Sequence, residues 1–312
     1  MVKFGMIEVK NISKDFDGLR AVDDITFTVT AGEILGFLGP NGAGKSTTMK
    51  MITGFLVSDT GSITVCGHDL ATDVLAAQKL IGYLPEGAPC YEDMTPRKFL
   101  NFIAEVRGFH NQEKRQRVDA VVKEMALQSV ENQHIETLSK GFKRRVGLAQ
   151  AILHDPEVLI LDEPTDGLDP NQKHHVREMI RGLSKDKIVI ISTHILEEVT
   201  AVCTRVMIID EGRIVTDCTP QELEAESKYH HAVTVELDVS PALEAKFLAI
   251  PGVDSVVTDD PGKRITIFPR DGQSIIKSVS DLIHAEDLSI GGLHVERGRL
   301  DEVFRSITTR GL

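Results

Sequence analysis

The sequence predicts an α/β fold in the N-terminal part of the chain and a small α+β domain after it. Three observations predict this division. Short, continuous apolar runs at 158–162 and 188–192 are typical of parallel strands that helices cover on both faces. A glycine-rich loop at 39–46 separates a predicted strand from a predicted helix. Beyond the polar residues at 220–230 the pattern changes, which indicates a domain boundary.

The first domain, residues 1–220, begins as strands that alternate with helices. Residues 33–38 (EILGFL) read as a strand that runs into the glycine-rich loop, and a helix is expected near 45–54. The apolar run 206–210 (VMIID), a turn and residues 213–215 read as a hairpin. The glycine-rich loop is therefore expected at the end of a strand, directly before a helix.

A helical subdomain is expected over about 88–155, inserted between the strands of the first domain. Thr95 and Pro96 read as an N-cap and the first residue of a helix. Apolar side chains then recur at helical spacing, at Phe99, Phe102, Ile103 and Val106. A second helix is expected over 115–126.

The C-terminal domain, residues 229–312, alternates strands and helices again. Strands are expected at 232–239, 264–268 and 293–296, and helices at 241–249, 273–285 and 300–307. A β-α-β-β-α-β order, which this segment indicates, is that of a ferredoxin-like sandwich. The segment contains no constellation of catalytic side chains, so a packing domain is expected; dimerisation or regulation is the alternative.

Composition disfavours general nucleic-acid binding and metal or redox chemistry at cysteines. The net charge of −12 disfavours a general affinity for nucleic acid, because lysine and arginine would have to neutralise phosphates. A basic cluster, Lys140, Lys143, Arg144 and Arg145, reads as a solvated helix face. The four cysteines show no CxxC spacing, so reduced thiols are expected.

Targeting signals are not evident in the sequence. No apolar run approaches the ~18 residues that span a bilayer. The first residues, MVKFGMIEVKN, lack the apolar core of a signal peptide. We expect a cytoplasmic protein without direct membrane insertion, whose membrane role would come through a partner.

The loop at 39–46, GPNGAGKS, fits the phosphate-loop pattern G-x-x-x-x-G-K-[ST] at every fixed position. Glycines let backbone N–H groups surround a phosphate, and the following helix directs its positive end at the same anion. Lys45 adds a charge for the terminal phosphates, and Ser46 can place its hydroxyl on Mg²⁺. A simple glycine-rich turn is the alternative, which the flanking strand and helix disfavour.

Two adjacent carboxylates, Asp162 and Glu163, end the apolar run 158–162. Burying both is costly unless positive charge or hydrogen bonds meet them. Asp162 would reach Mg²⁺ near Ser46, directly or through water, while Glu163 would orient the water that attacks the γ-phosphate. An Asp-Glu turn after a strand would be the preferred interpretation without the phosphate loop.

These motifs together resemble the nucleotide-binding subunits of ABC transporters over residues 6–220. The resemblance implies a P-loop NTPase fold of the ABC ATPase type. GPNGAGKST resembles the Walker A loop, VLILDE the Walker B strand, LSKGF the signature, GLD the D-loop and STH the switch region. The Walker A residues that would bind ATP are Gly39, Pro40, Asn41, Gly42, Ala43, Gly44, Lys45, Ser46 and Thr47.

Further roles are implied by the resemblance alone. Ser139, Lys140 and Gly141 of the signature would act in trans on the ATP of a second ATPase subunit, in an arrangement expected to be a homodimer. Asp169 would link the two sites, and His194 would contact the γ-phosphate and the attacking water. Phe16 would stack on adenine; a plain core position is the alternative.

Two positions depart from the family pattern. In the signature, usually LSGGQ, Lys140 and Phe142 replace a glycine and the glutamine, and Lys140 is expected to point to solvent rather than to the composite site. Glu86 replaces a glutamine that senses Mg²⁺ and water in many relatives. A carboxylate can still bind Mg²⁺, often through water, so the role of Glu86 rather than the family is in doubt.

The resemblance implies an ATPase that uses ATP and Mg²⁺ and powers transport through a separate transmembrane permease subunit, peripheral on the cytoplasmic face of the membrane. The segment from Glu86 to about 110 is where relatives contact that subunit. Residues 293–307 resemble the ending of bacterial ATPases of multidrug, antibiotic or gliding-motility exporters.

Two other classes compete with this interpretation. A soluble ABC ATPase acting on ribosomes or nucleic acid usually carries two cassettes, or a long coiled coil between its Walker motifs; this sequence has neither. A binding module that has lost hydrolysis is disfavoured because Glu163 and His194 are both present.

Overall fold

The computed structural model describes residues 5–88, 90–238, 240–259 and 263–308. The chain divides into two compact units, Met1–Cys218 and Thr219–Leu312. The boundary between the units lies just before the polar stretch at 220–230 that separates the two sequence patterns.

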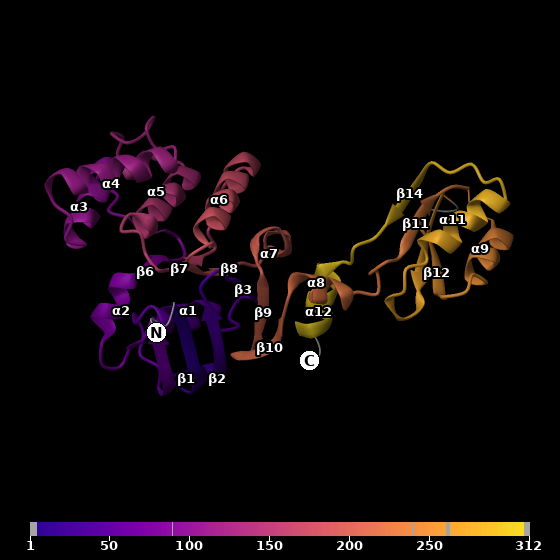
Figure 1. Ribbon diagram of the computed structural model, residues 1–312, viewed down its shortest axis with the longest axis horizontal. Helices are drawn as coiled ribbons and strands as arrows, with labels where there is room; N and C mark the ends of the chain where they lie inside the picture. Colours follow the sequence, from indigo (N-terminus) through magenta and orange to yellow (C-terminus); the bar gives the residue numbers. More distant parts are fainter. Residues whose placement is uncertain (1–4, 89, 239, 260–262, 309–312) are drawn as a thin grey trace. The chain divides into compact units, whose positions relative to one another are not determined.

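A six-stranded sheet forms the centre of the first unit (Figure 1). In spatial order its strands are β10 (Arg213–Cys218), β9 (Arg205–Asp210), β3 (Ile34–Leu38), β8 (Ile188–Ser192), β7 (Val158–Asp162) and β6 (Ile81–Leu84). All neighbours are parallel except the β9–β10 hairpin. Strands β3, β7 and β8 are buried along their whole length, as their continuous apolar runs predict.

The two faces of this sheet belong to two different cores. Leu159 and Leu161 of β7 pack among helices, whereas Val158 and Ile160 pack toward a second, antiparallel sheet. That sheet has the order β2 (Leu19–Thr30), β1 (Met6–Phe16), β4 (Thr60–Val65) and β5 (His68–Asp69). Helices α1 (Lys45–Ile52) and α2 (Val74–Leu80) complete this side of the unit.

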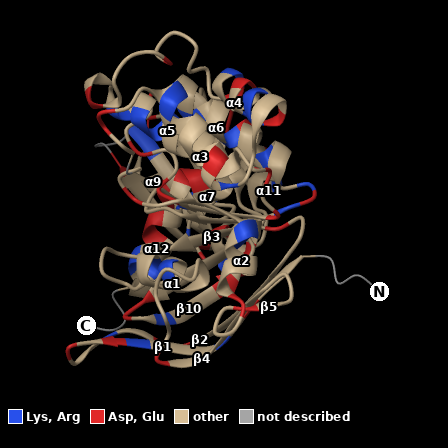
Figure 2. Ribbon diagram, turned by 90° about the vertical axis from the view of Figure 1, so that its left-hand side faces the viewer, with Lys and Arg blue, Asp and Glu red and all other residues tan. Residues whose placement is uncertain are grey.

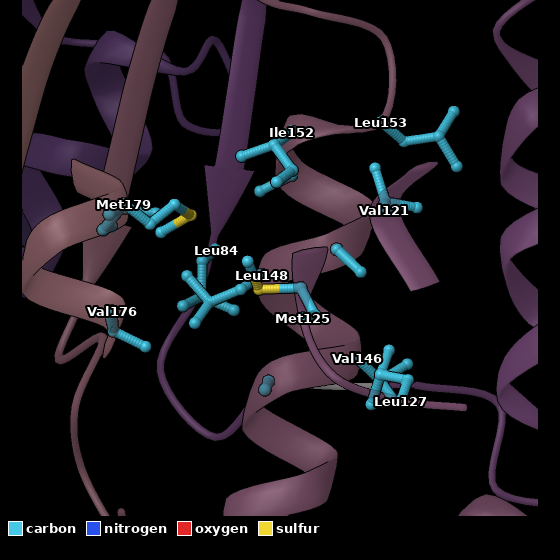
Figure 3. Packing of buried hydrophobic residues seen from close by; sticks show 14 of the residues in the cluster. Leu84, Val121, Met125, Leu127, Val146, Leu148, Ile152, Leu153, Val176 and Met179 are labelled. Atoms are coloured by element: carbon cyan, nitrogen blue, oxygen red, sulfur yellow. The ribbon is translucent and has the colours of Figure 1, made fainter. Parts of the chain in front are cut away.

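The helical core contains five helices and one 3-10 turn. They are α3 (Pro96–Val106), α4 (Asn111–Glu124), η1 (Ile135–Thr137), α5 (Lys140–Ile152), α6 (Pro170–Leu183) and α7 (Leu196–Val202). Figure 3 shows side chains from α4, α5, α6 and β6 meeting in this core. Helix α5 is buried along most of its length, so its position is fixed by packing on several sides.

The start of α3 confirms the predicted cap, because the Thr95 hydroxyl accepts a hydrogen bond from the backbone N–H of Lys98 at 3.3 Å. The predicted apolar face is wrong in part. Phe99 is buried, but Phe102 and Val106 are exposed, and Leu100 and Ala104 take their place in the core. The α4 helix begins four residues before the predicted 115, at Asn111.

The basic cluster at 140–145 was expected to be a solvated helix face, and this is wrong for two of its members. Arg144 and Arg145 are only 4% and 8% exposed, because both lie on the side of α5 that faces the protein. Lys140 is exposed. Figure 2 shows basic and acidic positions together along α4, where Arg117 and Glu113 form an ion pair at 3.1 Å.

The second unit contains a four-stranded antiparallel sheet in the order β12 (Val253–Asp259), β13 (Arg264–Pro269), β11 (Val233–Glu236) and β14 (Gly292–Val295). Helices α9 (Pro241–Leu248) and α11 (Ile276–Ala285) share its apolar core. These elements follow one another as β-α-β-β-α-β, the order typical of ferredoxin-like folds. The strand β12 was not assigned a range from the sequence, and Val239, the predicted end of the first strand, lies outside the described residues.

Two further helices, α8 (Pro220–Ala225) and α12 (Leu300–Thr308), pack against each other at the two ends of the second unit's chain. A 3-10 turn, η2 (Arg270–Gly272), follows β13. Within the described part of the chain, no helix combines the length and the apolar character that a bilayer crossing requires.

Candidate functional site

The phosphate loop joins β3 to α1, as the sequence predicts. Gly44 adopts φ 103°, and a Cβ atom there would lie 2.4 Å from the carbonyl oxygen of Ala21. Only glycine tolerates both constraints, so this residue lets the loop turn directly into the helix. The helix α1 begins at Lys45, and its first N–H groups therefore belong to the loop itself.

The Lys45 ammonium is held over the loop. It donates to the carbonyl oxygens of Gly39 at 2.7 Å and Pro40 at 3.0 Å, and the side chain is buried. Burial lowers the pKa of Lys45, and the nearby carboxylates of Glu163 and Asp162 oppose that shift. The Lys45 ammonium and two carboxylates thus lie at this edge of the sheet.

Asp162 ends β7 opposite Ser192, the last residue of β8. It is 2% exposed, and its Oδ1 accepts a hydrogen bond from the Ser192 hydroxyl. Its Oδ2 is buried and has no hydrogen-bond partner among the described residues. A buried carboxylate oxygen of this kind suits a divalent cation, so Asp162 fits the predicted Mg²⁺ site.

Glu163 lies in the left-handed backbone region, with φ 52°. Its side chain reaches the loop after β8. Its Oε1 lies 2.9 Å from Nδ1 of His194. The side chain of His194 is 60% exposed. Burial raises the pKa of Glu163, and the hydrogen bond from His194 opposes this.

Glu86 follows β6, the strand next to β7, and its side chain is exposed. It contributes to the negative potential at Lys45, which places its charge at the same edge. Tyr83, on β6, is a neighbour that the sequence analysis did not single out. Its hydroxyl is buried, and burial together with Asp162 and Glu86 raises the pKa of Tyr83 to about 12.

The signature residues lie at the start of α5. Ser139 is the N-cap, and its hydroxyl accepts a hydrogen bond from the N–H of Phe142 at 3.3 Å. Ser139 and Lys140 are exposed, whereas Gly141 is buried against α6, where a Cβ would lie 2.8 Å from Oε1 of Gln172. Within the described residues, no hydrogen bond joins these three residues to the phosphate loop.

Two other predicted residues have clear local surroundings. Asp169 caps α6, because its Oδ1 accepts a hydrogen bond from the N–H of Gln172 at 2.9 Å. Phe16 ends β1 and is 44% exposed, with the Lys14 ammonium 5.7 Å from its ring centroid. The alternative that Phe16 is a plain core residue is therefore wrong.

Sequence reasoning missed a buried carboxylate, Glu198. Its two oxygens accept hydrogen bonds from the hydroxyls of Thr165 and Thr193, the latter at 3.0 Å. Thr165 follows Glu163 by two residues and Thr193 directly precedes His194, so Glu198 joins the two loops that carry this pair. An acidic residue in a helix has no sequence signature for such a role.

Comparisons with known proteins agree with the motifs. Residues 22–166 match the family described as ABC transporter. The linearmycin resistance ATP-binding protein LnrL of Bacillus subtilis (strain 168) is 33% identical over 311 residues, which cover 98% of this chain and 99% of that protein. The Nod factor export ATP-binding protein I of Burkholderia pseudomallei (strain K96243) is 38% identical over 218 residues, covering 70% of this chain and 72% of that protein.

Solved structures agree as well. The ATP binding subunit of an ABC transporter is 31% identical with a TM-score of 0.66, covering 70% of this chain and 92% of that chain. The dimeric ATP-binding cassette MJ0796 bound to ADP and Pi has a TM-score of 0.64 over 69% of this chain and 98% of that chain. The latter is 20% identical and shows similarity of fold.

Proposed function

Because the chain belongs to the ABC transporter family as one of its ATP-binding subunits, we propose that it powers export through a separate membrane-spanning permease. The chain is an ATPase of the P-loop type. The observation that carries the ATPase assignment is the convergence of Lys45, Asp162 and the Glu163–His194 pair at one edge of the central sheet. The similarity to a Nod factor export ATP-binding protein supports export as the direction of transport.

ATP binding is assigned to the phosphate loop. The backbone N–H groups of residues 39–47 and the start of α1 would surround the phosphates, and Lys45 would exchange its contacts with the loop carbonyls for the terminal phosphates. Phe16 is exposed enough to present its ring to an adenine.

Hydrolysis is assigned to Glu163 and His194. The Glu163 carboxylate would accept the proton of the attacking water, and the imidazole, hydrogen-bonded to Oε1 of Glu163, would contact the γ-phosphate. The exposure of His194 leaves its other ring nitrogen accessible to a nucleotide.

Mg²⁺ would be held by Ser46 and Asp162, with Glu86 contributing through water. The ion, when bound, neutralises charge on the β- and γ-phosphates. The Oδ2 of Asp162, which has no hydrogen-bond partner in the part of the chain that the structure describes, supports this assignment, while Oδ1 is oriented by Ser192.

A head-to-tail pair of subunits would complete the site. Ser139, Lys140 and Gly141 stand at the N-terminus of α5, and two of these residues are exposed, so a second copy can reach them. In such a dimer the serine hydroxyl would meet the γ-phosphate bound by the partner, and Asp169 would lie between the sites. The dimer would close when ATP binds and open after hydrolysis, and this movement would drive transport through the permease.

The permease would dock on the segment after Glu86. Tyr91 and Phe102 are exposed and their rings lie 5.6 Å apart, and Val106 is 68% exposed one turn later. Exposed apolar side chains grouped in this way are typical of a protein interface. The chain would then lie peripherally on the cytoplasmic face of the membrane.

Replacing Glu163 with glutamine tests the assigned chemistry. We expect hydrolysis to slow by roughly 10²- to 10⁴-fold, the scale for losing a positioned general base, while ATP binding persists. Steady-state turnover and equilibrium ATP binding measure the two quantities. Glu197 is an exposed acidic residue in helix α7. Glu197→Gln is therefore the matched control and should retain normal turnover. Near wild-type turnover of Glu163→Gln would refute the assignment.

A further inference from the structure

Arg144 is a buried arginine whose guanidinium, among the described residues, donates to backbone carbonyls. Its Nη2 donates to the carbonyl oxygens of Asp162, at 2.7 Å, and Glu163. Its Nη1 donates to the carbonyl oxygen of Pro85 at 3.3 Å. One side chain on α5 thus joins the end of β7 to the residue that precedes Glu86.

The backbone of Glu163 needs such support. A non-glycine residue with φ 52° is held in a conformation that costs free energy, and it persists only where its surroundings fix it. The N–H of Glu163 donates to the carbonyl oxygen of Ser192 at 3.1 Å and to its hydroxyl at 3.2 Å. The Glu163 carbonyl accepts from Arg144 and from the backbone N–H of Asp166 at 3.2 Å, so both backbone polar groups of Glu163 are held, and Arg144 is the side chain that holds the carbonyl.

The positive charge of Arg144 lies near several carboxylates. Burial lowers its pKa, and the carboxylates of Asp166 and Asp162 oppose this most strongly. The N–H groups of a guanidinium are spread over a wide, rigid, planar fork that can reach carbonyls lying apart from one another, whereas the three N–H groups of a lysine ammonium all radiate from a single nitrogen.

We propose that Arg144 is a positioning residue for ATP hydrolysis: it fixes the strained backbone at Glu163 and thereby holds the Glu163 carboxylate against His194. The inference rests on the proposed role of Glu163 as the general base. Because its guanidinium donates to the carbonyls of Pro85, Asp162 and Glu163, Arg144 would act on turnover rather than on ATP affinity.

The neighbouring Arg145 offers a matched control. It is also buried and also donates to backbone carbonyls, those of Met125 and Ala126, both at 3.2 Å. These carbonyls follow α4, and Arg145 stacks on Phe142, with 4.1 Å from its guanidinium carbon to the ring centroid. A lysine substitution there perturbs the same helix by the same chemistry but leaves the contacts of Glu163 in place.

The first test compares Arg144→Lys with Arg145→Lys, using ATP and Mg²⁺. We expect Arg144→Lys to lower kcat about tenfold or more while the Kd for ATP without divalent ions changes by less than about threefold. Arg145→Lys should lower the melting temperature but keep kcat within about threefold of the original protein. Equal kcat values for the two variants would overturn the proposal. Arg144→Gln, whose amide can still donate to a carbonyl, replaces Arg144→Lys if that variant does not fold.

A double-mutant cycle separates positioning from general damage. If Arg144 acts through the Glu163 carboxylate, adding Arg144→Lys to Glu163→Gln should change the residual single-turnover rate by less than about twofold. A full multiplication of the two losses would overturn the proposal. If Glu163→Gln alone retains normal turnover, the proposed base fails; if it is slow and Arg144→Lys is not, only the role of Arg144 fails.

Discussion

At the residue scale, Asp162 and Glu163 are adjacent acids with different partners. The Asp162 carboxylate accepts from Ser192 on the neighbouring strand, while Glu163 turns to His194 in the loop that follows. The two carboxylates have different partners, so the two charges do not compete for one partner. The strand therefore ends in two carboxylates that can serve two different purposes.

Lys45→Ala is expected to weaken ATP binding itself. The buried ammonium is the cation of the phosphate loop, and its removal leaves the loop and Asp162 without that charge. Equilibrium binding of ATP should show at least about a tenfold rise in Kd, the scale for losing a charged hydrogen bond to phosphate. Lys50→Ala, an exposed lysine in the last turn of the same helix, should bind normally. Normal affinity of Lys45→Ala would contradict the phosphate-loop assignment.

The raised pKa of Glu163 predicts the pH dependence of hydrolysis. A base must be ionised, and a carboxyl with a raised pKa stays protonated to a higher pH, so activity should fall on acidification through that raised pKa. The acid limb of kcat/KM should lie above the ~4.3 of an ordinary glutamate. Because ATP also ionises, part of the acid limb can come from the substrate, and the profile of Glu163→Gln serves as the reference. The part of the acid limb that comes from Glu163 should be missing from the pH profile of this variant. An identical acid limb in both proteins would exclude Glu163 as its source.

At the element scale, the sequence predicts the bounds of a strand best where the strand is completely buried. The strands at 158–162 and 188–192 have the predicted bounds, because a strand buried on both faces needs an unbroken apolar run. The long strand β1 was not assigned. It pairs with irregular register on both sides, and its bulges interrupt the alternation by which such strands are recognised.

Local pattern failed where tertiary contacts decide the environment of a side chain. The charged run at 140–145 has the composition of a solvated helix, yet Arg144 donates to the carbonyls of Asp162, at the end of β7, and of Pro85, just after β6, both distant in sequence. The phosphate loop and the Asp162–Glu163 pair were predictable because their chemistry depends on neighbours in the chain. Glu198 and Arg144 depend on contacts that no local pattern encodes.

Gly298 is expected to control the pairing of α8 with α12. It adopts φ 124°, and a Cβ there would lie 2.4 Å from the carbonyl oxygen of Glu224, at the end of α8. Gly298→Ala should therefore release α12, which limited proteolysis within 298–308 would detect as faster cleavage. In Gly291→Ala, where φ is not positive and the nearest atom would be 3.6 Å away, cleavage should be unchanged. Unchanged cleavage in Gly298→Ala would contradict this account of the contact.

At the scale of the whole molecule, the chain joins an ATPase unit to a smaller unit that has an apolar core of its own. The similarity to LnrL extends over 98% of the chain, whereas that to the Nod factor export protein covers 70%. We propose that Thr219–Leu312 is an accessory domain, and that ATP chemistry belongs to Met1–Cys218, which holds every residue assigned to it.

The measurement that tests the central claim most directly is the identity of the proteins that copurify with this chain. Tagged Glu163→Gln would be expressed in the native cell, extracted from membranes in mild detergent with ATP and Mg²⁺, and purified, with Lys45→Ala as a control in which ATP binding is weakened. We expect a stoichiometric membrane protein with several spanning segments. Recovery only from the soluble fraction, bound to ribosomes or DNA, would contradict the transporter account and leave the ATP chemistry serving another machine.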